Sequence, residues 1–96
     1  MNKSIILSEL KKVKPVLSNK YGLTTLALFG SYSRDEQTPQ SDIDLMVDFQ
    51  PIIAKNFFNC VFELEDLFAG KKVQVVMKDG IKPRYFEAIK PDLIYA

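Results

Sequence analysis

Two aspartates separated by a single residue, Asp42 and Asp44, are the side chains in this sequence best suited to chemistry. They begin an alternating stretch, residues 42–49, and this pattern predicts a β-strand that is apolar on one face. The apolar face carries Ile43, Leu45, Val47 and Phe49, and the aspartates lie on the other face. Residues i and i+2 of a strand share a face, with Cα atoms about 6.5 to 7 Å apart. Both carboxylates could therefore bind one hard cation such as Mg²⁺. On its own, the pattern is more often a solvated strand face.

A second feature, Gly30-Ser31, follows the short apolar stretch Leu26 to Phe29. A glycine after a strand lets the main chain approach a phosphate, and successive N–H groups with a hydroxyl can bind its oxygens. Alone, this pair would indicate only a tight turn. If its strand neighbours the strand of the two aspartates, phosphate donors lie beside metal-binding carboxylates. Phosphoryl or nucleotidyl transfer needs that arrangement.

The elements that must position these residues follow from hydrophobic periodicity and from turn residues. Pro15 interrupts the first helical pattern, so we expect a kink or a new helical turn there. Pro51 suits the first turn of the second helix. The expected helices cover residues 4–20, 51–70 and 83–89, and the expected strands cover residues 24–29, 42–49, 72–77 and 92–95. The chain is thus predicted to be one α+β domain, residues 1–96, with a small mixed sheet of three to four strands and helices mainly on one face.

The two features stand ten residues apart, and Gly30-Ser31 followed by Asp42-Ile43-Asp44 resembles the signature of the polymerase-beta-type nucleotidyltransferases. The longer string LFGSYSRDEQTPQSDIDLMVDF resembles their minimal members (MNT), antitoxins that are encoded beside HEPN-domain toxins. The segments KPVLSNKYGL, LEDLFAGKKVQVV and IKPRYFEAIKPDLIYA are similar to the corresponding parts of that family. The resemblance therefore covers essentially the whole chain.

The resemblance implies a role for each matching residue. Arg34 would neutralise charge on the phosphates, the alternative being a solvated loop arginine. Ser41 would cap or orient the loop before the acids. The remaining implied roles are triphosphate binding by Gly30 and Ser31, and catalysis and Mg²⁺ binding by Asp42 and Asp44.

Two positions depart from the family pattern. Asp35 replaces the usual glycine and would add negative charge near the triphosphate. Gln74 replaces the third carboxylate, which in the family ligates the catalytic metal and helps to activate the attacking hydroxyl. A glutamine offers a neutral carbonyl oxygen but cannot act as a carboxylate base. Asp48 lies about 13 Å along the strand from Asp44, too far to share an ion.

The acids Asp66 and Asp79 remain open as substitutes for the missing third carboxylate. If the enzyme is active, the resemblance implies transfer of an NMP group, AMP from ATP, to a tyrosine hydroxyl of a HEPN-type toxin. The alternative is a degenerate transferase that neutralises its partner by binding alone. Antibiotic-modifying and RNA-tailing transferases rank third, because they carry a further substrate domain.

The composition of the chain limits the partners and the cellular location that we expect. The net charge of +1 provides no strong field for long nucleic acid or for an anionic membrane. The single cysteine, Cys60, lies in an apolar stretch and is expected to be a buried, inert thiol. Neither a signal peptide nor an apolar run of membrane-spanning length is found, so we expect a cytoplasmic protein. Seven phenylalanines and four tyrosines leave self-association open, and no pattern indicates a base preference.

Overall fold

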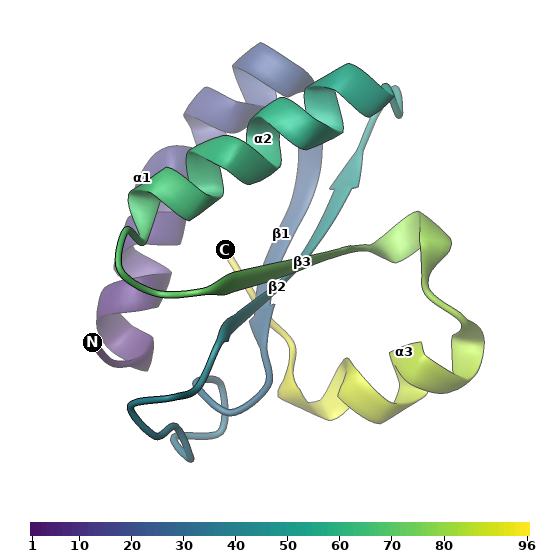
Figure 1. Cartoon of the computed structure of the whole chain (residues 1–96). Coiled ribbons are helices and arrows are strands. Elements are labelled where there is room, and N and C mark those ends of the chain that lie inside the picture. The colour runs from purple at the N-terminus through teal and green to yellow at the C-terminus, as the bar shows by residue number, and fades with distance from the viewer.

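A computed structural model describes all 96 residues and has a four-stranded sheet at its centre, in the order β3-β2-β1-β4 (Figure 1). The two central strands, β1 (Leu23–Phe29) and β2 (Ile43–Phe49), are antiparallel. The edge strand β3 (Val73–Met77) runs parallel to β2, and the short β4 (Ile94–Tyr95) pairs antiparallel with β1. The predicted mixed sheet is therefore confirmed.

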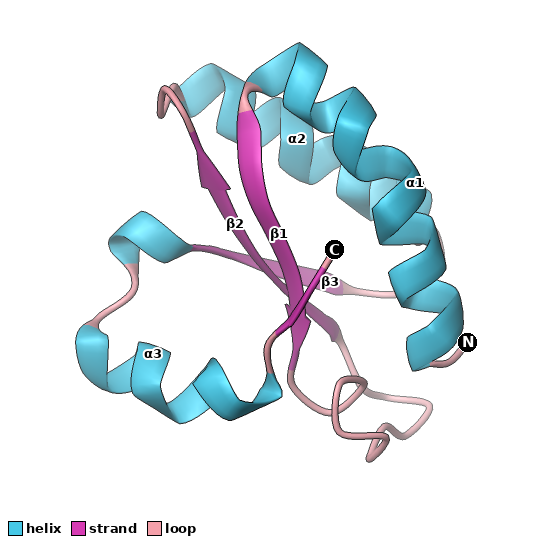
Figure 2. Cartoon of the chain, turned by 180° about the vertical axis from the view of Figure 1, so that it is seen from behind, coloured by secondary structure: helices cyan, strands magenta, loops and turns pink.

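Two long helices, α1 (Lys3–Tyr21) and α2 (Ala54–Leu67), cover one face of the sheet (Figures 1 and 2). The short α3 (Pro83–Ile89) lies on the opposite side, as the view from behind in Figure 2 shows. Helices thus cover mainly one face, as predicted. None of them is long and apolar enough to cross a lipid bilayer.

The two faces of β2 are both partly apolar. Side chains at alternate positions enter the main core beneath α1 and α2, and Met46 is fully buried on the other face beside Ile89 of α3. The prediction that this strand is apolar on one face only is therefore wrong, because α3 returns to cover the far face. The residues of β2 in the main core are Ile43, Leu45, Val47 and Phe49.

Helix α1 shows how local sequence sets its ends. The side chain of Asn2 accepts a hydrogen bond from the Ile5 N–H at 2.9 Å, and Gly22 ends the helix with a left-handed φ of 74°. The helix is continuous across Pro15, where a kink or a new turn was predicted. Pro15 is exposed, so water can satisfy the carbonyl left without a helical donor.

Helix α2 begins and ends inside its predicted range of 51–70. Pro51 lies outside the helix, because the Gln50 N–H donates to the Gly22 carbonyl at 2.9 Å and keeps the chain after β2 beside the α1–β1 turn. At the other end, Gly70 has a φ of 92° within the turn that leads to β3. Cys60 is fully buried in α2, and this burial raises the pKa of its thiol to about 11, as expected for an inert cysteine.

Candidate active site

The centre of the site is a close approach between Gly30 and Asp44. Phe29, the last residue of β1, pairs with Asp44 across the antiparallel ladder, so Gly30 follows directly beside the acid. A Cβ placed on Gly30 would lie 2.2 Å from an Asp44 carboxylate oxygen. Gly30 also has a φ of 79°, which side chains rarely adopt. The expected meeting of the turn and the acids is therefore present.

The turn after β1 leaves backbone donors available. The Arg34 N–H donates back to the Gly30 carbonyl at 3.2 Å, and the Glu36 N–H donates to the Ser31 carbonyl at 2.9 Å. The N–H groups of Gly30, Ser31 and Tyr32 make no hydrogen bond within the chain. Three successive donors at the end of a strand form the kind of concave surface that accepts phosphate oxygens.

The two acids of the site influence one another. Asp42 directly precedes β2 and Asp44 lies within it, and both are half-buried. Burial and the neighbouring charge of Asp42 raise the pKa of Asp44, and the Arg34 guanidinium partly opposes this rise. Because two close carboxylates repel one another when ionised, a cation would stabilise them. Their oxygen atoms suit a hard divalent ion, which often takes one or two carboxylates together with substrate phosphate and water.

Gln74 occupies the position beside Asp44 on the neighbouring strand. The parallel register pairs the two residues, and the Gln74 side chain is exposed. No three acidic, histidine or cysteine side chains come together anywhere in the chain. The possibility that Asp66 or Asp79 completes a three-carboxylate site is therefore excluded, and Asp48 stays apart as expected.

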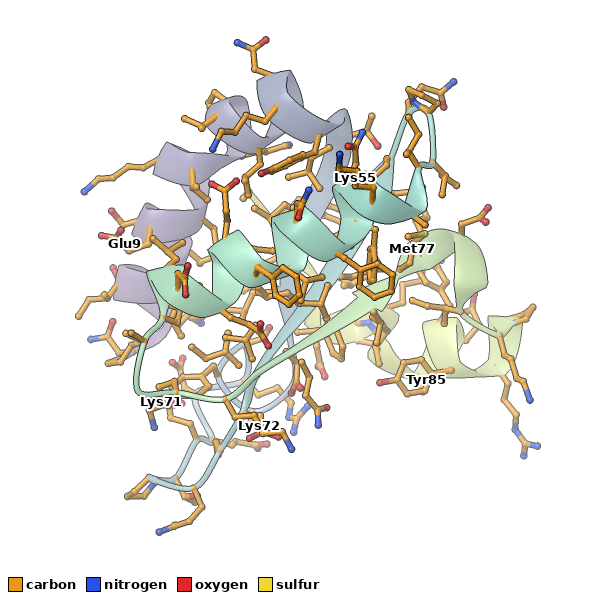
Figure 3. All side chains as sticks on the ribbon, turned by 45° about the horizontal axis from the view of Figure 1, so that its top comes forward. Glu9, Lys55, Lys71, Lys72, Met77 and Tyr85 are labelled. Atoms are coloured by element: carbon orange, nitrogen blue, oxygen red, sulfur yellow. The ribbon has the colours of Figure 1, made fainter.

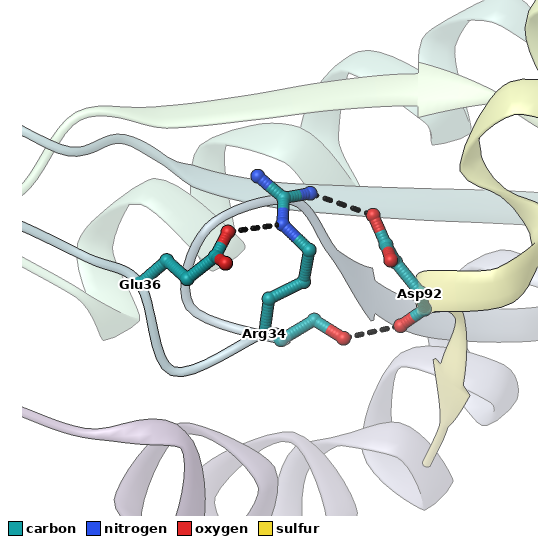
Figure 4. Close-up of polar contacts among 4 residues, drawn as sticks. Arg34, Glu36 and Asp92 are labelled. Carbon is teal, nitrogen blue, oxygen red and sulfur yellow. Dashed lines mark hydrogen bonds and ion pairs between the residues drawn. The ribbon is translucent and has the colours of Figure 1, made fainter.

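Arg34 is held by two carboxylates (Figure 4). Its Nε donates to Glu36 at 2.8 Å, and its Nη1 donates to Asp92 at 2.7 Å. The Ser33 hydroxyl donates to the Asp92 carbonyl, so two neighbouring residues fasten the loop to the segment before β4. Hydrogen bonds to both acids raise the pKa of Arg34 further, which keeps its charge fixed. Sequence reasoning missed Asp92, because it lies 58 residues from Arg34 and belongs to no local pattern.

Ser41 and Asp35 are the other two loop residues for which the sequence predicted a role. The Ser41 hydroxyl accepts a hydrogen bond from the Thr38 N–H at 2.8 Å and so closes the loop just before Asp42. Asp35 has a positive φ of 57°, which explains why a glycine is favoured at this position. Its carboxylate forms an ion pair with Lys3 of α1 at 3.0 Å. The positive charge of Lys3 offsets the negative charge that was expected to repel the triphosphate.

A phosphate-binding turn beside paired acids, on a small mixed sheet, defines the class of nucleotidyl-transfer proteins. Residues 10–95 match the family described as nucleotidyltransferase domain. The proposed protein adenylyltransferase MJ0128 of Methanocaldococcus jannaschii is 44% identical over 90 residues, which cover 90% of this chain and 89% of that protein. The chain belongs to the nucleotidyltransferase domain family, and the sequence prediction of a nucleotidyltransferase is confirmed.

Solved structures agree with this assignment. A proposed minimal nucleotidyltransferase superposes with a TM-score of 0.80 at 26% identity, over 98% of this chain and 95% of the other. A toxin–antitoxin complex with AMP-PNP superposes with a TM-score of 0.67 at 21% identity, over 99% of this chain and 72% of the other. At that identity the second likeness establishes the fold alone.

Proposed function

We propose that this protein is an Mg²⁺-dependent nucleotidyltransferase that moves an NMP group, AMP from ATP, onto a hydroxyl of a partner protein. The observation that carries the proposal is the contact between Gly30 and Asp44, because it joins a phosphate-binding turn to a pair of metal-binding acids. The partner is a HEPN-type toxin, and the protein acts as its antitoxin in the cytoplasm. The single domain of residues 1–96 carries the whole reaction.

Each residue of the site has a defined task in this reaction. The N–H groups that follow β1 bind the β- and γ-phosphates together with the Ser31 hydroxyl. Asp42 and Asp44 would hold Mg²⁺, which supplies charge neutralisation at the phosphates. The acceptor oxygen forms a bond to the α-phosphorus while the bond to the bridging oxygen breaks, and pyrophosphate leaves. Gln74 cannot accept the hydroxyl proton, so this proton passes to water and turnover is slow.

Support for the partner comes from the relatives. The relative MJ0128 is named for protein adenylyl transfer, and one structural neighbour is a toxin–antitoxin complex that contains an ATP analogue.

A second candidate function is neutralisation of the partner by binding alone. Gln74 favours it, since the third acid is missing, and so do large apolar side chains that remain accessible on the surface. Phe58 and Phe62 of α2 are 57% and 58% exposed, respectively. Apolar residues one helical turn apart commonly form part of a protein interface.

Incubation with α-labelled ATP, Mg²⁺ and the HEPN-type partner separates the two functions. The enzyme transfers label to the partner, and the Asp42→Ala, Asp44→Ala double variant does not. Partner neutralisation in cells is measured in parallel. If the unchanged protein transfers no label and the double variant neutralises the partner as well as the unchanged protein does, binding alone suffices and the transferase proposal is wrong.

A further inference from the structure

The strand order fixes the direction from which an acceptor reaches the site. Gly30 and Ser31 follow β1, Asp44 lies on the adjacent β2, and Gln74 lies beyond it on β3. In phosphoryl and nucleotidyl transfer the attacking and leaving oxygens are roughly in line. If pyrophosphate leaves on the side of β1, the acceptor hydroxyl must approach from the side of β3.

An apolar cleft of about 440 Å³ opens on that side, between β3, the 3₁₀ turn Lys78–Gly80 (η1) and the start of α3. Val76 lies two residues after Gln74 on the same face of β3, about 7 Å further along. It packs against the small core that contains Met46 and Ile89, so the cleft and the acids share one face of the sheet. The lining residues are Val76, Met77, Gly80, Ile81, Lys82 and Tyr85.

Tyr85 is the one aromatic side chain that lines this cleft. It is 47% exposed, and Figure 3 shows its ring extending from α3. Met77, at the end of β3, lines the same cleft. A ring held this way can stack on another aromatic ring. The cleft volume greatly exceeds that of a phenyl group, so a side chain can enter together with part of its backbone segment.

We propose that this cleft is the acceptor subsite, which receives an aromatic side chain from the segment of the partner protein that carries the acceptor hydroxyl. The inference rests on the proposed function and adds the place where the acceptor binds. The nucleobase is the competing occupant. The nucleobase is connected to the α-phosphorus through the ribose. The bond from the ribose to the α-phosphorus does not lie on the line that joins the attacking oxygen to the leaving oxygen. The side of attack therefore fits the acceptor better than the base.

The test compares two exposed tyrosines at opposite edges of the sheet. Tyr85 lines the cleft beside β3, whereas Tyr95 lies in β4 at the other edge and is 53% exposed. Label transfer from ATP is measured against partner concentration and against ATP concentration. Tyr85→Ala raises the KM for the partner about tenfold or more and leaves the KM for ATP unchanged. Tyr85→Phe keeps the ring and restores the original KM, and Tyr95→Ala changes neither constant.

Two results overturn the proposal. A higher KM for ATP with an unchanged KM for the partner assigns the cleft to the base. No change in either KM means that the cleft binds neither the acceptor side chain nor the nucleobase. If the unchanged protein transfers no label, the proposed function fails, and the cleft is then tested by equilibrium binding of the partner. In that case Tyr85→Ala must weaken the complex about tenfold, and an unchanged affinity overturns the inference.

Discussion

Gln74 of β3 lies directly beside Asp44 of β2 in the parallel register of the sheet. The side chain at this position reaches the same face as the acid, next to the site where an acceptor would lose its proton. An exposed amide there can orient a ligand but cannot take up a proton. In the proposed reaction, this departure from the three-acid pattern should therefore affect turnover more than nucleotide binding.

Replacing Gln74 by Asp is expected to accelerate transfer. A correctly placed general base contributes about 100-fold or more, so Gln74→Asp should raise the rate of label transfer by that order. The Gln74→Asn variant is the matched control, since it shortens the side chain equally without adding a charge, and it should not accelerate the reaction. Equal rates for the two variants would mean that the acceptor does not pass beside β3.

Adding a methyl group at Gly30 should disable the site. A Cβ there would meet the Asp44 carboxylate at 2.2 Å and displace it. A shift of about 1 Å in a catalytic group costs about 100-fold in rate, so Gly30→Ala should lose transfer by at least that amount. The positive φ also costs about 1–2 kcal/mol of unfolding free energy, which denaturant titration measures.

Gly70 provides the control for backbone strain. Its φ of 92° is likewise positive, but a Cβ there meets no atom within 4 Å. Gly70→Ala should therefore lose similar stability and keep its transfer rate. If both variants lose activity equally, the loss at Gly30 comes from strain or partial unfolding, and the contact with Asp44 is not its cause.

The sequence predicted the relationship between Gly30 and Asp44, because an apolar strand, a turn and an alternating strand in succession favour neighbouring strands. It also predicted α3 as residues 83–89, since Pro83 sets the start of that helix. The anchoring of Arg34 by Asp92 could not be predicted, because it joins distant segments through side chains with no shared periodicity. The prediction that Pro51 lies in the first turn of α2 was wrong for a similar reason. Its neighbour Gln50 bonds to Gly22, which lies far away in sequence.

Asp44 should reduce the stability of the folded protein at neutral pH. Its pKa is raised in the folded state by burial and by Asp42, so the folded protein binds this proton more tightly than the unfolded chain. Stability is therefore lost as pH rises from the ordinary carboxyl range through the raised pKa. Without divalent cations, Asp44→Asn should raise the melting temperature at pH 7, and this gain should disappear below about pH 4. In the presence of Mg²⁺ the same variant should lose activity by more than the roughly 10- to 100-fold that follows from losing a residue that only supports a metal ligand. A gain in stability that does not vary with pH would contradict this explanation.

Arg34 should lower the pH at which Mg²⁺ affinity begins to fall through protonation of Asp44. Its guanidinium lowers the pKa of Asp44 and opposes the effects of burial and Asp42. Arg34→Gln should therefore raise the pKa of Asp44 further, and Mg²⁺ affinity should begin to fall at a higher pH than in the unchanged protein. Arg34→Lys retains a charge and should shift this pH less. Titration of Mg²⁺ affinity from pH 4 to pH 8 measures the effect, and coincident curves for all three proteins would show that Arg34 exerts no field on the acid.

Asp35 should tolerate glycine but not a β-branched residue. Its φ of 57° is left-handed, a conformation open to glycine and to Asn or Asp but costly for other side chains by about 1–2 kcal/mol. Asp35→Val should therefore be about 1–2 kcal/mol less stable than Asp35→Gly in denaturant titration. Both changes remove the exposed ion pair with Lys3, which contributes at most about 1 kcal/mol, so this loss cancels in the comparison. Asp35→Asn also removes the ion pair but keeps a side chain suited to the conformation, and it should match Asp35→Gly more closely than Asp35→Val. If valine and glycine give equal stability, the loop relaxes to a different backbone, and the geometry of the turn after β1 does not depend on the conformation at this position.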